Sequence, residues 1–217
     1  MTTRNLAIVL AGCTAVVLVA MVAVTMATGA TQEVHEWYAA PDDYARSLLA
    51  HPGALRLLFG LDVAFLVLYS AFFTALAAHL KALGRPFTRL ALAAMIGTAL
   101  LDIVEDHHIL AMLGMAEHGR PISDFEIAMQ QVISSTKFSV SYLSLVLFGL
   151  AVPRDTKLGL ALALFLIVGN LATGIASYAV PPELRESIDG GRWIGFLVGF
   201  GLAIAWLRTS KDPTPRS

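Results

Sequence analysis

Six apolar stretches divide the sequence, and several are near or above the ~20 residues that a helix needs to cross the hydrocarbon core of a bilayer. They cover residues 5–27, 54–80, 87–115, 125–152, 158–180 and 193–207. Proline, glycine or charge separates them, as at 84–86 and 119–121, because proline cannot continue a helix. The pattern predicts an all-α, polytopic transmembrane helical bundle of about six helices, with residues 1–217 forming a single transmembrane domain.

The composition also favours a membrane environment. Hydrophobic residues make up 57% of the chain and charged residues 14%, whereas soluble domains contain about 45–50% and about 25%. The lipid bilayer is therefore the expected partner. A net charge of −1 without a basic run argues against nucleic-acid binding, and the lone Cys13 excludes both an intrachain disulfide and a thiol-rich metal site.

Lysine and arginine gather in alternate loops. The two chain ends and the loops at 81–89 and 154–157 are basic, whereas the loops at 31–53, 117–126 and 183–192 are rich in acids. Because basic loops tend to stay in the cytoplasm, we expect an inner (plasma) membrane protein of bacterial type with both termini cytoplasmic.

The longest loop, residues 31–53, is then expected on the outer side. Its second half is suited to a short interfacial helix. Trp37, Tyr38 and Tyr44 fit the belt of aromatic residues that sits at the lipid headgroups. The alternative interpretation is that this loop forms a lid over a site.

Charged residues within the predicted spans are the most informative feature for function. A charge near the bilayer centre costs a few kcal/mol, so such residues usually face the bundle interior and mark functional sites. The charged residues in the predicted spans are Asp62, Asp102, Glu105, Asp106 and Lys137.

Helical periodicity brings these residues together. At 100° per residue, Asp102, Glu105 and Asp106 share one face of the third span. Gln130 and Lys137 belong to a polar stripe on the fourth span, and a smaller polar face lies on the fifth. The predicted site for a cation, a proton or a polar ligand comprises Asp62, Asp102, Glu105, Asp106, Gln130, Lys137 and Asn170.

The charge balance of this site predicts its chemistry. Four carboxylates against one lysine leave about −3 in a place of low dielectric constant, and buried carboxylates without partners take up protons or bind cations. Lys137 is expected to pair with Asp102 or Asp62. Such a pair could also do no more than fix the register of the helices.

A metal is one candidate for the missing positive charge. Glu105 and His108 have the Glu-x-x-His spacing that di-iron carboxylate bundles use twice, although this chain has the motif once. With Asp102 they form a ladder along one helix, so Asp102, Glu105 and His108 are the predicted ligands of a divalent metal ion. Imidazole also suits haem iron, which is the weaker alternative.

Three classes of function remain open. The sequence favours an outward-facing carboxylate and histidine site that binds or transports a cation, a proton or a small polar solute. The alternatives are a membrane-embedded, metal-dependent hydrolase or oxidoreductase and an accessory subunit of a larger membrane complex. Gly195 and Gly199 form a GxxxG pattern, which permits close helix packing within one bundle or in a homo-oligomer.

Overall fold

The computed structural model describes residues 1–179 and 185–210, with the backbone alone for residues 185–189. The long helices are α1 (Thr3–Thr28), α3 (Pro52–Ala82), α4 (Thr88–Glu117), α5 (Asp124–Ala151) and α8 (Arg185–Thr209). A further helix runs through α6 (Lys157–Leu164), a π-helical segment, η2 (Phe165–Gly169), and α7 (Asn170–Ala179). The loop after α1 contains a 3₁₀ turn, η1 (Glu33–Glu36), and the short helix α2 (Pro41–Ala50). No strand occurs in the described part of the chain.

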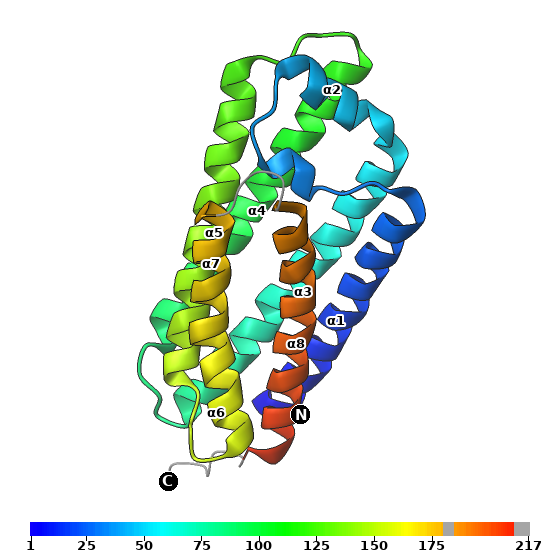
Figure 1. The fold of residues 1–217 in the computed structure, drawn as a ribbon. Coiled ribbons are helices and arrows are strands. Elements are labelled where there is room, and N and C mark those ends of the chain that lie inside the picture. The colour runs from blue at the N-terminus through cyan, green and yellow to red at the C-terminus, as the bar shows by residue number, and fades with distance from the viewer. Residues whose placement is uncertain (180–184, 211–217) are drawn as a thin grey trace.

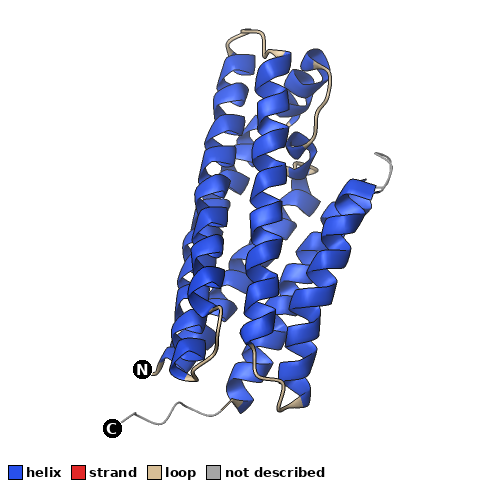
Figure 2. Cartoon of the chain, turned by 90° about the vertical axis from the view of Figure 1, so that its left-hand side faces the viewer, coloured by secondary structure: helices blue, strands red, loops and turns tan. Residues whose placement is uncertain are grey.

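The all-α fold is confirmed, and Figure 2 shows the long helices running side by side. Among the described residues, five helices are long and apolar enough to cross a membrane: Thr3–Thr28, Pro52–Ala82, Asp124–Ala151, Lys157–Ala179 and Gly190–Thr209. Helix α4 has 30 residues, but its acidic side chains keep it outside this set. A sixth span therefore stays a prediction.

Local sequence explains where the helices begin and end. Ser123 and Glu126 form a capping box at the start of α5, in which each satisfies a free backbone N–H of the other. Gly29 ends α1 with a φ of 74°, a left-handed conformation that costs glycine little. The predicted boundaries differ most at α8, which begins at residue 185 rather than 193, because a helix can continue through Gly190 and Gly191. The predicted break at 181–182 and the charges at 183, 211, 212 and 216 lie outside the described residues.

The helices enclose two separate apolar cores. The larger core joins α1, α3, α4, α5, α6 and α8 and includes Leu18, Phe72 and Trp206. The smaller core lies where α2 meets α3, α4 and α5, and it includes Tyr44 and Ile109. Figure 1 shows why a second core exists: α3, α4 and α5 extend beyond the upper ends of α1, α7 and α8, and α2 covers this extension.

The surface of the long helices is apolar. Val16, Leu100, Val132 and Ile175, from four different helices, are each at least 60% exposed. Apolar side chains spread over the whole circumference are expected of helices that face lipid. Together with the apolar spans, they indicate an integral membrane protein.

Candidate cation site

The predicted charged residues lie between the two cores. On α3, Asp62 lies between Phe59 of the smaller core and Phe65 of the larger one. On α4, the acidic face lies between Ala99 and Ile109 in the same way. The polar stripe of α5 follows the same pattern between its two apolar ends. Each helix therefore contributes polar residues at one level, and these side chains are buried: Asp62, Asp102, Glu105, Asp106, Gln130, Ser134 and Lys137.

Lys137 is the cation of this cluster. Its Nζ lies 2.9 Å from Oδ1 of Asp102 and also pairs with the carboxylate of Glu105. The Tyr69 hydroxyl donates a hydrogen bond of 3.3 Å to the other oxygen of Asp102. The predicted ion pair between Lys137 and Asp102 is confirmed, and Glu105 is a second partner.

Glu105 is held mainly by side chains of α5. The Ser134 hydroxyl donates to Oε1 of Glu105, and the Gln130 amide donates to the same oxygen over 3.4 Å. Ser134 and Gln130 are one helical turn apart, so both reach across to α4 from the same face. The polar stripe predicted on α5 thus faces the acidic face of α4.

Three aspartates converge on one point. One carboxylate oxygen from each of Asp62, Asp102 and Asp106 lies within 4.8 Å of the other two. Asp62 comes from α3, whereas Asp102 and Asp106 are one turn apart on α4. The Oδ2 atom of Asp62 is buried without a hydrogen-bond partner. Unpaired buried carboxylate oxygens are costly, so this position calls for a proton or a cation.

The predicted metal ligands Asp102, Glu105 and His108 do not form one group. Nδ1 of His108 lies 2.8 Å from Oε1 of Gln130, so the Gln130 amide stands between His108 and Glu105. Positions 102 and 108 are separated by about 9 Å along the helix, which is too far for a shared ion. Asp106, at i+4 from Asp102, takes the position expected for His108. His107 is exposed and bonds its own helix at Ile103.

Asn170 lies apart from the acidic cluster. Its amide donates to the carbonyl of Leu166 over 3.0 Å, within its own helix. It follows directly on the π-helical segment Phe165–Gly169, and such segments are frequent at functional sites. Asn170 also lines the cavity described next, so it belongs to the wall of the cavity rather than to the charged cluster.

A cavity of about 390 Å³ adjoins the cluster. Four of the helices that line it, α3, α4, α5 and α8, each contribute one charged residue at the end nearest η1: Asp62, Asp102, Lys137 and Arg192. Apolar residues follow on each of these helices. The deeper wall is formed by Phe65, Phe72, Phe73, Leu76, Met95, Leu145, Phe165, Phe196 and Phe200. The cavity is therefore charged at one end and aromatic at the other.

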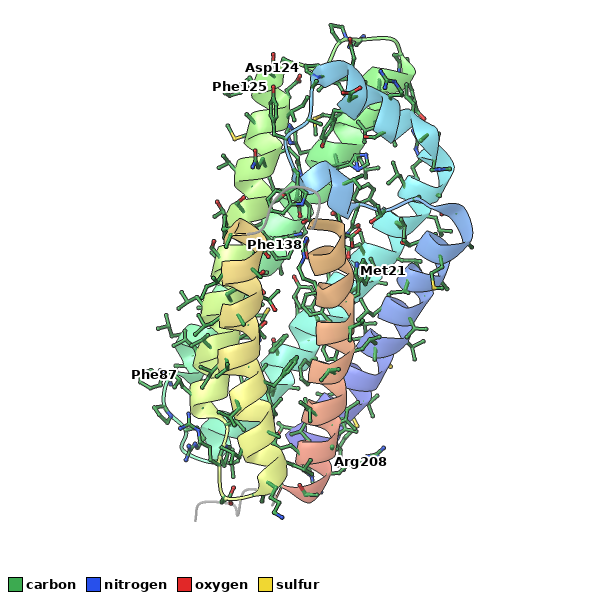
Figure 3. All side chains as sticks on the ribbon, in the orientation of Figure 1. Met21, Phe87, Asp124, Phe125, Phe138 and Arg208 are labelled. Atoms are coloured by element: carbon green, nitrogen blue, oxygen red, sulfur yellow. The ribbon has the colours of Figure 1, made fainter. Side chains whose placement is uncertain are left out.

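The loop between α1 and α3 covers this charged end. Glu33, His35 and Glu36 of η1 are buried, and both glutamates line the cavity. Arg192 of α8 donates to Oε2 of Glu36 over 2.8 Å. The Arg192 guanidinium also lies 4.1 Å from the centre of the Phe138 ring, and Figure 3 shows Phe138 beside the upper ends of α7 and α8.

This arrangement favours the lid interpretation of the loop. Tyr44 packs in the smaller core, and its hydroxyl donates to the carbonyl of His35 over 3.0 Å, so it does not belong to an aromatic belt. The pair between Glu36 and Arg192 could not be predicted from the sequence. A 3₁₀ turn of four residues has no periodicity to detect, and its partner lies on the last helix.

Burial changes the proton affinity of the lid residues. Desolvation lowers the pKa of His35 from 6.5 to about 4, so the ring is neutral near pH 7. Desolvation also raises the pKa of Glu36 to about 8, opposed by the positive charges of Arg192 and Lys137. Burial therefore favours the neutral form of both side chains, and for Glu36 the charge of Arg192 opposes it.

The cluster and its lid have the chemistry of a site for positive charge. Carboxylate oxygens outnumber the cations that face them, and one of these oxygens lacks any partner. Comparison with known proteins found no matching family model, no similar curated protein and no similar solved structure. The function of the site therefore has to be inferred from its chemistry.

Proposed function

We propose that this chain is a cation-binding protein of a bacterial inner membrane, with both termini cytoplasmic and the site opening to the outer side. The cation binds among Asp62, Asp102 and Asp106, and protons occupy the site in its absence. The observation that carries the proposal is the convergence of these three buried carboxylates within 4.8 Å. Binding is the core of the proposal, and transport across the bilayer would extend it.

Charge supports the proposal. Asp62, Asp102, Glu105 and Asp106 face Lys137, which leaves about −3 if all are ionised. Lys137 neutralises the side of the cluster that Glu105 occupies. Asp62 and Asp106 lie close enough to share a hydrogen bond. Two carboxyl groups can form such a bond only when one of them carries a proton. A bound cation would replace that proton.

The arrangement of the ends supports the orientation. The start of α1 and the end of α8 lie at the same end of the bundle (Figure 1), where Arg4 donates to the carbonyl of Ser210 over 2.8 Å. The basic loop at 154–157 also lies at this end. The lid and the loop at 117–126 lie towards the opposite end. Basic residues mark the cytoplasmic side, so the lid opens outwards.

The ligand atoms decide which inorganic cation is the right probe. The cluster offers carboxylate oxygens and no thiolate, and its nearest histidine is bound to Gln130. Such oxygen ligands suit Mg²⁺, Ca²⁺ and Mn²⁺. Mn²⁺ is paramagnetic and can be followed directly by electron paramagnetic resonance.

The test is Mn²⁺ binding to the purified full-length protein, with proton release recorded in weak buffer. We expect binding to release protons, and Asp62→Asn or Asp106→Asn to weaken it by at least about tenfold. Asp43→Asn is the matched control, because Asp43 pairs with Arg46 at the exposed surface. If Mn²⁺ binds equally to wild type and to all three variants, the proposed site is wrong.

A further inference from the structure

The cavity beneath the acidic cluster is much larger than a metal ion requires. Its volume of about 390 Å³ falls in the range of about 300–1,000 Å³ that small-molecule sites occupy. A single inorganic cation would need only the carboxylates at the outer end. The aromatic chamber below them therefore calls for a second explanation.

The chamber wall is built from interlocking rings of α3 and α8. Phe72 and Phe200 lie 5.5 Å apart between ring centres, and Phe65 and Phe200 lie 6.4 Å apart. Phe72 and Phe73 lie 4.8 Å apart, in an edge-to-face arrangement. These rings meet at interplanar angles of 61° to 85°, and all of them line the cavity. Faces of aromatic rings attract cations, and organic ammonium ions above all.

The charged residues at the outer end of the cavity determine whether its ligand is a cation or an anion. Both cations of the cavity wall already have carboxylate partners, since Lys137 pairs with Asp102 and Arg192 pairs with Glu36. Asp62 lines the same cavity, is only 3% exposed, and has one oxygen without a partner. An anion would meet this carboxylate with repulsion. A neutral apolar molecule would leave it unsatisfied.

We infer that the cavity binds a lipophilic organic cation, with its positive head at Asp62 and its apolar body in the aromatic chamber of Phe65, Phe72 and Phe200. This inference rests on the proposed function and names the class of cation. The head gains a charge-assisted contact in a place of low dielectric constant. The body gains burial of apolar surface and contact with ring faces.

The first experiment compares two probes of the same shape and opposite charge. Binding of tetraphenylphosphonium and of tetraphenylborate to the purified full-length protein is measured by equilibrium dialysis. We expect the cation to bind at least about tenfold more tightly than the anion. We also expect Asp62→Asn to weaken binding of the cation about tenfold, because the cation loses its attraction to the carboxylate charge, and to leave binding of the anion no weaker. Equal affinity for the two probes would overturn the inference.

The second experiment tests the aromatic chamber. Phe72→Leu and Phe200→Leu are each expected to weaken tetraphenylphosphonium binding about fivefold while leaving Mn²⁺ binding unchanged. Phe125→Leu is the matched control, because Phe125 is 71% exposed at the start of α5 (Figure 3). If the three variants lose the same affinity, the cation does not bind in the chamber.

A third measurement locates the probe without altering the wall of phenylalanines. Trp193 lines the cavity, so tetraphenylphosphonium should change its fluorescence, and Trp193→Phe should abolish the change. A fluorescence change that survives in Trp193→Phe would place the probe elsewhere. If tetraphenylphosphonium does not bind while Mn²⁺ binding still depends on Asp62, the inference of an organic ligand is wrong and the proposed cation site is kept. If neither probe depends on Asp62, both proposals fail.

Discussion

The guanidinium of Arg192 lies 2.8 Å from the carboxylate of Glu36, although 156 residues separate the two in the sequence. The pair joins the lid turn η1 to the last helix, and both side chains are less than 10% exposed. Losing one partner of a buried pair is costly, because the other charge is then left without compensation. We therefore expect the pair to act as a latch that keeps the lid over the acidic cluster.

The latch gives a prediction about lid opening. At a pH above 8, where Glu36 is ionised, Arg192→Gln leaves its carboxylate buried without a cation, so the lid should open more often. We expect hydrogen exchange at the amides of residues 33–38 to become at least about tenfold faster. Arg46→Gln is the control: Arg46 and Asp43 pair at the surface, where an ion pair contributes little. Equal exchange rates in wild type and Arg192→Gln would show that the pair does not hold the lid.

The buried ring of His35 predicts an effect of pH on the lid. Its pKa is about 4 in the closed lid and 6.5 in water, so the closed lid favours the neutral ring. This stabilisation is complete above pH 6.5 and is lost as the pH falls towards 4. The difference corresponds to about 3 kcal/mol. Falling pH should therefore add an opening contribution from His35 through this window, and Glu36 opposes it. The His35 contribution is the difference in lid hydrogen exchange between wild type and His35→Gln at each pH, in which the intrinsic pH dependence cancels.

The titration of Glu36 changes the stability of the closed lid in the opposite direction to that of His35, so the two effects have to be measured separately. Its pKa is raised to about 8, so the closed lid favours the protonated acid and gains stability as the pH falls below 8. His35→Gln keeps Glu36 but removes the titrating ring. Between pH 6.5 and 4, lid exchange in this variant should therefore slow relative to that in wild type. If the ratio of the two exchange rates stays constant across this window, His35 does not open the lid.

Replacing the buried Lys137 by a neutral residue should greatly lower the stability of the fold. Lys137→Met removes the cation that faces Asp102 and Glu105, which leaves two buried carboxylates without it. We expect a loss of about 3–5 kcal/mol in the free energy of unfolding in detergent. Adding Glu105→Gln should recover part of this loss, because one uncompensated charge is then removed. If the second substitution only adds to the loss, the two residues are not coupled.

Helical periodicity was enough to predict the fold and part of the site. The long apolar runs identified the helices, because a span of ~20 residues can satisfy its backbone in lipid in few other ways. The pair between Lys137 and Asp102 could be expected from their positions around their helices alone, since each lies on the polar face of its helix. Even so, phase did not identify Glu105 as the second partner of Lys137.

The remaining contacts depend on tertiary structure that the sequence does not encode in a local pattern. Asp106 rather than His108 meets Asp62 and Asp102, and this choice depends on how α4 is rotated against α3 and α5. The lid depends on a turn of four residues. The aromatic chamber combines side chains of helices that are distant in sequence, and phenylalanines in an apolar span look alike whether they face a cavity or lipid.

The last prediction concerns the orientation of the bundle, on which outward access to the site depends. In a Cys13→Ala background, single cysteines at Arg154 and Arg120 report on opposite ends, and both residues are exposed. Arg154 lies at the end that carries both termini of the bundle, where basic residues gather, and Arg120 lies between α4 and α5 at the lid end. We expect a membrane-impermeant thiol reagent added to whole cells to label Arg120→Cys and not Arg154→Cys, with the reverse in inverted vesicles. The opposite labelling would put the lid in the cytoplasm, so the acidic cluster would then draw its cation from inside the cell.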